Sequence, residues 1–252
     1  MGRVNNKVAL VTGGASGVGK ETVELLLQEG AYVAFGDIDV TAGEALAKAC
    51  GERALFLRHD VSNEVEWQQV ITKVQAHFGP LDILINNAGI LLPGSIETAT
   101  LAQFRQLMQV NADSCFLGCQ QGIAAMKERG GSIVNMASVS TWLPIEGYAG
   151  YSASKAAVAA LTRASALYCR KNGLAIRVNS LHPDGIYTPM MKATAPGVPE
   201  KYLLFDPKVN PKGRAIMPVH IAKVLLFLAS DDSMAISGAE IKADSAILGM
   251  GL

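Results

Sequence analysis

The sequence predicts a single α/β domain, residues 1–252, built on a doubly wound parallel sheet of about seven strands with helices on both faces. Three observations predict it. Short apolar runs alternate with longer amphipathic stretches along the chain, as strands alternate with helices in this class. The strand-like runs are almost wholly apolar, which is typical of strands covered on both faces. No low-complexity linker divides the chain.

The expected elements follow one another in a regular order. The strand-like runs are 8–11, 32–35, 54–57, 81–85, 132–136, 175–180 and 239–243. The helix-like stretches are 18–29, 41–50, 63–78, 100–128, 152–171 and 219–229. Parallel neighbours need a crossover connection, and these helices supply it. The order therefore predicts a Rossmann-type sheet.

One segment, 188–213, breaks this rhythm with prolines and glycines: Pro189, Pro196, Gly197, Pro199, Pro207, Pro211 and Gly213. A connection of that length in a compact domain is usually a lid or binding loop. We expect 188–213 to be a lid loop over a substrate site.

Composition excludes several classes of protein. The 22 basic and 22 acidic residues cancel, so we expect no nucleic-acid partner. No run approaches the roughly 18 apolar residues of a membrane span, and no membrane partner is expected. The four cysteines and four histidines show no metal-ligand spacing, so no metal site is expected. The cysteines also show no regular disulfide framework, which predicts a reducing, cytoplasmic setting.

The first strand runs into a glycine-rich turn before a helical pattern begins. Glycines permit a tight turn and close backbone approach, and a helix N-terminus offers free N–H groups to a pyrophosphate. The turn is therefore expected to bind a dinucleotide through Gly13, Ser16, Gly17, Val18 and Gly19.

The second strand ends in Asp37, 18 residues after Gly19, where such folds bind the adenosine ribose. A carboxylate there would repel a 2′-phosphate, and neither Ser16 nor Ile38 offers a compensating cation. The sequence therefore favours NAD over NADP as the cofactor.

The third and fourth strands also end at the carboxyl edge of the sheet, where this fold binds its ligands. We expect the adenine and its ribose to lie beside Asp60, Val61, Asn87, Ala88 and Gly89. Taken alone, Asp60 and Asn87 could equally cap a helix or turn.

Tyr151 and Lys155 open a helical stretch, and their spacing of four places phenol and ammonium on one face. A free tyrosine has a pKa of about 10, and a nearby cation lowers an acid's pKa by roughly 1–3 units. Lys155 and an oxidised nicotinamide would supply two cations. Ser138 ends the fifth strand, where its hydroxyl can donate to a substrate oxygen.

Thr12-Gly-x-x-x-Gly-x-Gly, Asn86-Asn-Ala-Gly, Ser138 and Tyr151-x-x-x-Lys155, in that order, resemble the short-chain dehydrogenase/reductase family over the whole chain. The resemblance implies hydride transfer between a nicotinamide and a secondary alcohol or ketone, with Tyr151 as acid/base. It implies that Ser138 polarises the substrate oxygen and that Lys155 binds the nicotinamide ribose and assists Tyr151. It also implies that Asn111 positions a water in a proton relay behind Lys155.

The family carries a Pro-Gly pair after the sixth strand, whereas this chain reads Pro183-Asp184-Gly185. The resemblance still implies that Pro183, Ile186 and Thr188 contact the nicotinamide carboxamide and the phosphates. The intervening Asp184 departs from the family's pattern and is expected to face the substrate region.

Within the family, the segments 89–93, 138–146 and 182–191 and the chain end 247–252 look like those of bacterial 3β/17β-hydroxysteroid dehydrogenases. With Asp184, a large and mostly apolar substrate cavity would be lined by Leu92, Pro93, Ser140, Trp142, Leu143, Met190 and Met191. The alternative is that the apolar residues merely pack the lid.

The sequence thus predicts an NAD-dependent oxidoreductase for a bulky secondary alcohol, foremost a 3β/17β-hydroxysteroid. Alternatives are another cyclic or terpene-type alcohol or ketone, and a non-catalytic redox sensor, which has no need of Ser138, Tyr151 and Lys155. A hydrolase would need a Gly-x-Ser-x-Gly elbow, which the sequence lacks. The resemblance also implies a homotetramer with the helices 100–128 and 152–171 in one interface.

Overall fold

The computed structural model describes residues 2–194 and 196–249, and its centre is one seven-stranded sheet. In spatial order the strands are β3 (Ala54–Arg58), β2 (Tyr32–Asp37), β1 (Val8–Thr12), β4 (Ile83–Asn86), β5 (Gly131–Met136), β6 (Ile176–Pro183) and β9 (Glu240–Ala243). Every neighbouring pair is parallel. The predicted doubly wound sheet and its number of strands are confirmed.

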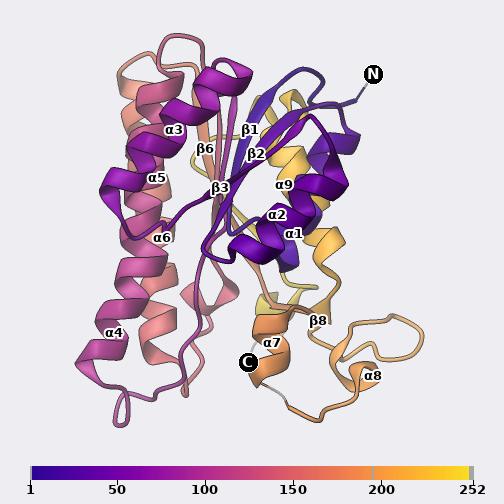
Figure 1. Ribbon diagram of the computed structural model, residues 1–252. Coiled ribbons are helices and arrows are strands. Elements are labelled where there is room, and N and C mark those ends of the chain that lie inside the picture. The colour runs from indigo at the N-terminus through magenta and orange to yellow at the C-terminus, as the bar shows by residue number, and fades with distance from the viewer. Residues whose placement is uncertain (1, 195, 250–252) are drawn as a thin grey trace.

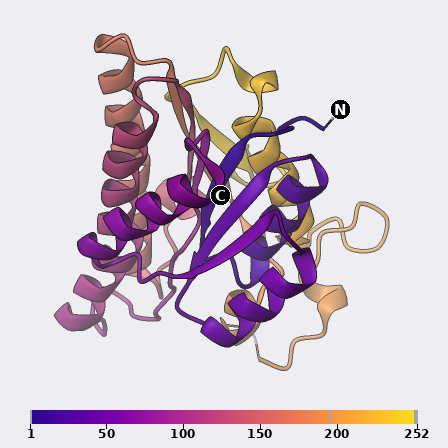
Figure 2. The same cartoon turned by 45° about the horizontal axis from the view of Figure 1, so that its top comes forward.

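Two layers of helices cover the sheet. On one face lie α1 (Gly17–Gln28), α2 (Val40–Cys50) and α9 (Pro218–Ala229). On the other lie α3 (Glu64–Phe78), α5 (Ser114–Met126) and α6 (Ala149–Lys171). Figure 1 shows the two layers on either side of the strands, and Figure 2 shows the same separation from a second direction.

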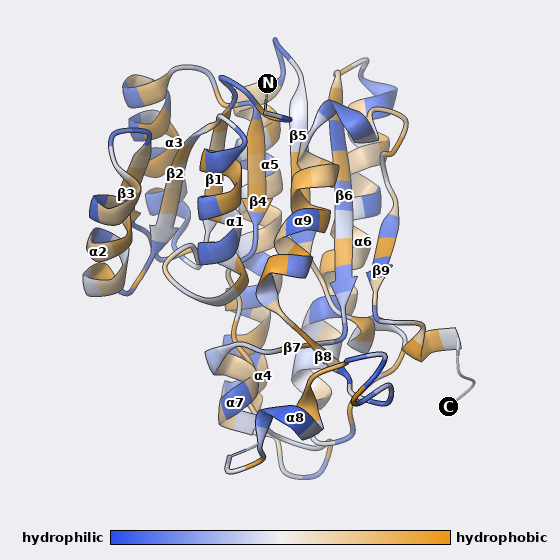
Figure 3. Ribbon diagram, turned by 90° about the vertical axis from the view of Figure 1, so that its right-hand side faces the viewer, coloured by the Kyte–Doolittle hydropathy of each residue, from blue (hydrophilic) through white to orange (hydrophobic). Residues whose placement is uncertain are grey.

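Successive residues of one strand enter two different hydrophobic cores. In β1, Val11 packs into the core beneath α1 and α9, whereas Leu10 packs with Trp67 of α3. The same alternation separates Leu84 from Ile85 in β4. Both faces of β1 and β4 are buried, so these strands are almost wholly apolar. Figure 3 shows β4 largely in the hydrophobic colour, whereas β6 and β9 also carry polar residues.

The stretch predicted as one helix over 100–128 consists of three parts. They are α4 (Leu101–Leu107), a π-helical turn η1 (Met108–Asp113) and α5. Thr100 starts α4 with a capping box that it shares with Gln103. π-turns are frequent at functional sites, and Asn111 lies within this one.

The segment 188–213 is not a continuous loop, which corrects the prediction. It contains the short helices α7 (Pro189–Thr194) and α8 (Glu200–Leu203). At its base the two-residue strands β7 (Gly185–Ile186) and β8 (Ala215–Ile216) pair in parallel. Figure 1 places α7, α8 and β8 together beyond one end of the sheet. That this segment acts as a lid stays a prediction.

Three short 3₁₀ turns complete the described elements: η2 (Val139–Thr141), η3 (Asp231–Ser233) and η4 (Ile247–Gly249). The described residues do not include residue 195, which belongs to the predicted lid. They also leave out residue 1 and residues 250–252 of the predicted domain. Within 2–194 and 196–249, no helix combines the length and apolar character needed to cross a bilayer.

Candidate active site

The turn between β1 and α1 has no room for side chains at its glycines. Gly13 has φ +63°, and a Cβ there would lie 2.9 Å from the Ala88 Cα atom. A Cβ on Gly19 would lie 1.9 Å from the Gly13 carbonyl oxygen. This is the tight, bare backbone that a dinucleotide pyrophosphate needs, so the residues fit such a cofactor.

The N-terminus of α1 begins just beyond this turn. Ser16 is the N-cap, and its side chain makes no capping bond within the described residues, so the first N–H groups and the positive end of the dipole are available to an anion. Val18 is buried in the first helical turn. The Thr188 methyl lies 3.3 Å from where a Gly17 Cβ would be, which brings the base of the segment 188–213 to the same turn.

Asp37 also lies at the turn. Its Oδ2 accepts from the Ala15 N–H at 3.0 Å, and its Oδ1 accepts from the Asp39 N–H at 3.1 Å. The carboxylate is thus fixed beside the glycine-rich turn, where a negative 2′-phosphate would be disfavoured.

Asn87 joins the fourth strand to the same turn. Its Nδ2 donates to the carbonyl oxygens of Thr12 at 3.0 Å and Gly13 at 3.1 Å. The Thr12 hydroxyl oxygen accepts from the backbone N–H groups of Asn87 and Ala88. Asn87 therefore has the turn-bracing role that was the alternative to a cofactor contact, and the contact stays a prediction.

Asp60 likewise caps its own chain. Its Oδ1 accepts from the backbone N–H of Ser62 at 3.0 Å and from the Ser62 hydroxyl at 2.7 Å, and the hydroxyl lowers the pKa of Asp60. The carbonyl of Val61 accepts from the Trp67 indole at 2.8 Å. Adenosine contacts by Asp60 and Val61 stay predictions.

Ser138, Tyr151 and Lys155 come together at the carboxyl edge. The Lys155 ammonium lies 5.8 Å from the centre of the Tyr151 ring and donates to the Met136 carbonyl at 2.7 Å. Ser138 follows β5, and its hydroxyl oxygen accepts from the Ser140 N–H at 3.1 Å. Lys155 and Ser138 are buried and Tyr151 is partly buried.

The protein groups alone do not make the phenol acidic. Burial raises the pKa of Tyr151, and the Ser138 side chain only partly offsets this rise. Burial also lowers the pKa of Lys155 to about 8, against a smaller opposing effect of Cys115. The protein alone therefore does not give Tyr151 the lowered pKa expected from Lys155. In the hypothesis, the positive charge of an oxidised nicotinamide would have to lower it.

Asn111 lies behind Lys155 with its amide already bonded. Its Nδ2 donates to the Ile90 carbonyl and to the Ser154 hydroxyl, both at 3.0 Å, and its Oδ1 accepts from the Ile90 N–H at 2.8 Å. A Cβ on Gly89 would lie 3.0 Å from the Asn111 Oδ1 and 3.4 Å from the Lys155 Nζ. Asn111 and Lys155 thus lie close together around Gly89, while a water-positioning role for Asn111 stays a prediction.

The expected contacts of the nicotinamide end lie where β6 leaves the sheet. Pro183 is the last residue of β6, and Ile186 pairs with Ile216 in the small two-stranded sheet. The Thr188 hydroxyl oxygen accepts from the Met191 N–H at 3.3 Å, at the start of α7. These positions are compatible with the predicted contacts, which stay predictions.

The predicted substrate residues come from three connections. These connections contain Leu92 and Pro93, then Ser140, Trp142 and Leu143, then Met190 and Met191. The first two connections touch, since the Gly94 N–H donates to the Gly147 carbonyl at 2.7 Å. That all three line one cavity stays a prediction.

Asp184 has a protein partner. Its two carboxylate oxygens accept from the Arg214 Nε at 2.8 Å and the Arg214 Nη2 at 2.7 Å. Instead of presenting a free carboxylate to a substrate, Asp184 ties β6 to the residue before β8.

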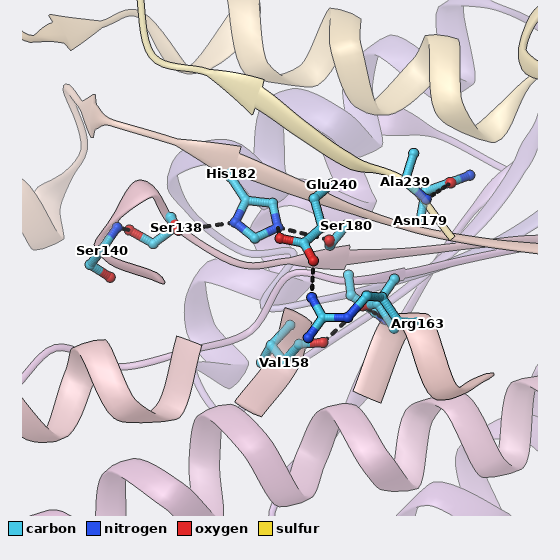
Figure 4. Close-up of polar contacts among 11 residues, drawn as sticks. Ser138, Ser140, Val158, Arg163, Asn179, Ser180, His182, Ala239 and Glu240 are labelled. Carbon is cyan, nitrogen blue, oxygen red and sulfur yellow. Dashed lines mark hydrogen bonds and ion pairs between the residues drawn. The ribbon is translucent and has the colours of Figure 1, made fainter. Parts of the chain in front are cut away.

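A polar cluster that was not predicted from the sequence lies behind Ser138. The buried His182 Nδ1 lies 3.0 Å from the Ser138 carbonyl oxygen, and its Nε2 lies 2.8 Å from the Ser180 hydroxyl (Figure 4). The Trp142 ring lies on the imidazole, with centroids 4.4 Å apart. The cluster is not a hydrolase triad, because the hydroxyl that His182 reaches belongs to the fully buried Ser180 and its Nδ1 faces a carbonyl oxygen instead of a carboxylate.

A hollow of about 910 Å³ lies at the opposite, amino edge of the sheet, where Lys7, Gly131 and Ile176 precede or begin their strands. None of the predicted site residues lines it. Among the residues described by the structure, no cluster of three histidine, cysteine or acidic side chains could hold a metal ion.

Comparison with known proteins identifies the family. A family model described as enoyl-(acyl carrier protein) reductase matches residues 13–246. The chain is 65% identical over 251 residues to a 3-beta-hydroxysteroid dehydrogenase of Comamonas testosteroni, covering 99% of both chains. It is 39% identical to a 3-alpha-(or 20-beta)-hydroxysteroid dehydrogenase of Mycobacterium tuberculosis, covering 96% of this chain and 90% of the relative. It is 35% identical to an NADP-dependent (R)-specific alcohol dehydrogenase of Lentilactobacillus kefiri, covering 96% of each. The chain belongs to the short-chain dehydrogenase/reductase family, whose members are oxidoreductases that use nicotinamide dinucleotides.

Proposed function

We propose that this protein catalyses the NAD-dependent, reversible oxidation of a bulky secondary alcohol, foremost a 3β- or 17β-hydroxysteroid. The observation that carries the proposal is the meeting of Ser138, Tyr151 and Lys155 at the carboxyl edge of the sheet. The substrate class is supported by the full-length similarity to the Comamonas 3-beta-hydroxysteroid dehydrogenase.

The proposed cofactor site has a pyrophosphate end and a ribose end. Gly13, Gly17 and Gly19 leave the backbone of the turn bare, and the first turn of α1 would bind the pyrophosphate. Asp37, held by two backbone N–H groups, would accept from the adenosine ribose hydroxyls and select NAD. A relative named as NADP-dependent makes the direct comparison of both dinucleotides necessary.

The mechanism follows from which groups can move a proton. Tyr151 takes the hydroxyl proton of the alcohol at its phenolic oxygen, and the Ser138 hydroxyl donates to the substrate oxygen as negative charge develops. Lys155 would hold the nicotinamide ribose and, together with the positive charge of an oxidised nicotinamide, would stabilise the phenolate, with Asn111 behind it on the proton's onward path. A nicotinamide bound there would supply the hydride-transfer chemistry.

The decisive test is Tyr151→Phe. The variant should fold and bind NADH normally, yet lose at least about 100-fold in kcat, because only the proton-transferring oxygen is removed. Tyr168→Phe is the matched control, since Tyr168 is an exposed tyrosine on the same helix. Retention of more than a tenth of the turnover by Tyr151→Phe would refute the role of Tyr151.

The substrate class can be tested by measuring turnover on a panel of alcohols, with NADH formation followed by its absorbance. We expect the highest kcat/KM with 3β- or 17β-hydroxysteroids and NAD, and lower values with simple cyclic alcohols. The second candidate is a cyclic or terpene-type alcohol or ketone, and a cyclic alcohol is favoured by the 38% identity over 248 residues to a cyclopentanol dehydrogenase of Comamonas sp.. Dinucleotide binding without turnover on any substrate would favour a redox sensor.

We also propose a homotetramer. The outer faces of α5 and α6 expose Phe116 and Leu167, together with the small residues Ala153, Ala156, Ala160 and Ala164. Small residues permit close helix contacts, and exposed aromatic residues are typical of interfaces. Light scattering should give four times the mass of the chain, and a monomer at assay concentrations would contradict the proposal.

A cytoplasmic setting is proposed as well. All four cysteines, at 50, 115, 119 and 169, are free thiols, which is typical of proteins in a reducing compartment. Fractionation of the source cells, with activity recovered outside the cytoplasmic fraction, would contradict this.

A further inference from the structure

The polar cluster behind Ser138 contains a histidine that the mechanism above does not use. We propose that His182 is a positioning residue, which fixes the Ser138 main chain through one ring nitrogen and supports the Trp142 indole with its ring face. This inference rests on the proposed function, since it assigns a consequence to the placement of Ser138.

The hydrogen bonds determine how the ring is held. The Ser138 carbonyl can only accept, so the His182 Nδ1 must carry the proton that it donates over 3.0 Å. The Nε2 then accepts from the Ser180 hydroxyl over 2.8 Å. A flipped ring would place carbon atoms at both positions, so the two bonds define one orientation of the ring.

The surroundings favour this neutral tautomer. Burial is the main cause that lowers the pKa of His182 to about 4, and the positive charges of Lys155, Arg163 and Lys242 act in the same direction. The ring is therefore uncharged at neutral pH, and its Nε2 is free to accept from Ser180.

The cluster extends to the helix that carries Tyr151. Glu240 of β9 has one carboxylate oxygen 3.8 Å from the His182 Nε2, and its other oxygen is paired with Arg163 of α6 (Figure 4). Figure 4 shows the cluster joining the loop after β5, the strands β6 and β9, and α6. The cluster therefore lies where it can fix the position of Ser138 relative to α6, the helix that carries Tyr151.

His182 also contacts the Trp142 indole, which is the second group that we propose it positions. The indole and imidazole planes are inclined by only 31° with centroids 4.4 Å apart. The Lys242 ammonium lies 5.1 Å from the indole ring, while 41% of Trp142 stays exposed. The partly exposed indole, which we expect to contact a bulky substrate, therefore takes its position from His182.

Two substitutions separate the two actions. His182→Phe keeps a ring beneath Trp142 but removes the donor to Ser138, so kcat should fall about tenfold on every substrate, the loss expected for one hydrogen bond, with KM nearly unchanged. His182→Asn keeps a side-chain N–H donor close to the Nδ1 position but removes the ring. It should recover kcat to within about threefold of the parent while raising KM more for a hydroxysteroid than for cyclohexanol.

A double substitution tests whether His182 acts through Ser138. In a Ser138→Ala background, where the hydroxyl is gone, His182→Phe should have little further effect on the residual kcat, because coupled residues are not additive. Additive losses in kcat, or equal changes in kcat and KM for both His182 variants, would show a merely structural role and overturn the proposal.

The controls keep this test distinct from that of the proposed function. His59→Phe alters another buried histidine that packs against a tryptophan, and should leave kcat unchanged at saturating dinucleotide. Full turnover by Ser138→Ala would refute the proposed function itself, whatever the His182 variants do. If the His182 variants do not fold, Ser180→Ala removes one anchor of the ring and should lower kcat about threefold; an unchanged kcat would overturn the proposal.

Discussion

Replacing Asp184 by asparagine should loosen the segment 188–213 from the sheet without unfolding the domain. The carboxylate holds Arg214 by two charge-assisted hydrogen bonds of 2.8 and 2.7 Å, across the base of this segment. Asp184→Asn keeps the shape of the side chain but removes its charge and one of its acceptors. Its effect therefore reports on the ion pair.

The magnitude follows from the exposure of the two partners. Hydrogen bonds to charged groups contribute about 1.5–3 kcal/mol, but the Arg214 side chain is 49% exposed, and solvent screening reduces this to about 1–2 kcal/mol. A change of about 1.4 kcal/mol makes local opening about tenfold more frequent. The effect should be local, because β7, β8 and the main sheet keep their backbone ladders.

Limited trypsin digestion measures this opening, since Lys192, Lys201, Lys208 and Lys212 lie within the segment. Cleavage there should be about tenfold faster in Asp184→Asn, while cleavage elsewhere and the midpoint of thermal unfolding change little. Arg214→Gln should have a similar effect, and the double variant should add little more. An unchanged cleavage rate, or additive effects of the two substitutions, would refute the reasoning.

Two further predictions concern the dinucleotide turn and the buried histidines. Gly19→Ala would place a Cβ 1.9 Å from the Gly13 carbonyl oxygen; we expect at least a 100-fold weaker Kd for NADH by fluorescence titration, and an unchanged Kd would contradict the close packing. His59 and His182 both have pKa values lowered to about 4, mainly by burial, so the unfolded state binds more protons and stability should fall as pH drops from about 6.5 toward 4. Urea denaturation at pH 7 and pH 5 should differ by about 2 kcal/mol per histidine, whereas equal stability would show that these rings are not held neutral.

The sheet and its covering helices were predictable because their signal is local. An all-apolar run such as 8–11 is best explained as a buried parallel strand when a helix-like stretch follows each such run. The carboxyl ends of parallel strands meet at one edge, so Ser138 could be assigned to the same edge as the glycine-rich turn.

The short helices of the segment 188–213 were missed for a specific reason. Its prolines predicted a loop, yet Pro189 begins α7 and Pro199 is the N-cap of α8. Proline is tolerated in the first turn of a helix, where its missing N–H would have no intrahelical partner. A proline can therefore mark the start of a helix as well as its absence.

Contacts between distant residues were the other limit. The Asp184 and Arg214 side chains are 30 residues apart, and His182 and Ser138 are 44 apart. No periodicity or spacing connects such pairs, because they meet only once the sheet has formed. Asp184 was therefore expected near the substrate instead of in an ion pair, and no role was predicted for the buried His182.

The π-turn at Met108–Asp113 makes the length of this stretch as important as its composition. An α-helix advances by about 100° per residue, and a π-turn accommodates one residue more than the α-helical path would. Deleting one residue here would turn the π-turn into an ordinary α-helical turn and keep α4 and α5 in phase, whereas inserting one more residue would rotate α5 relative to α4 by about that angle. Buried Leu117 would then move toward solvent, so this stretch should tolerate a one-residue deletion far better than an insertion.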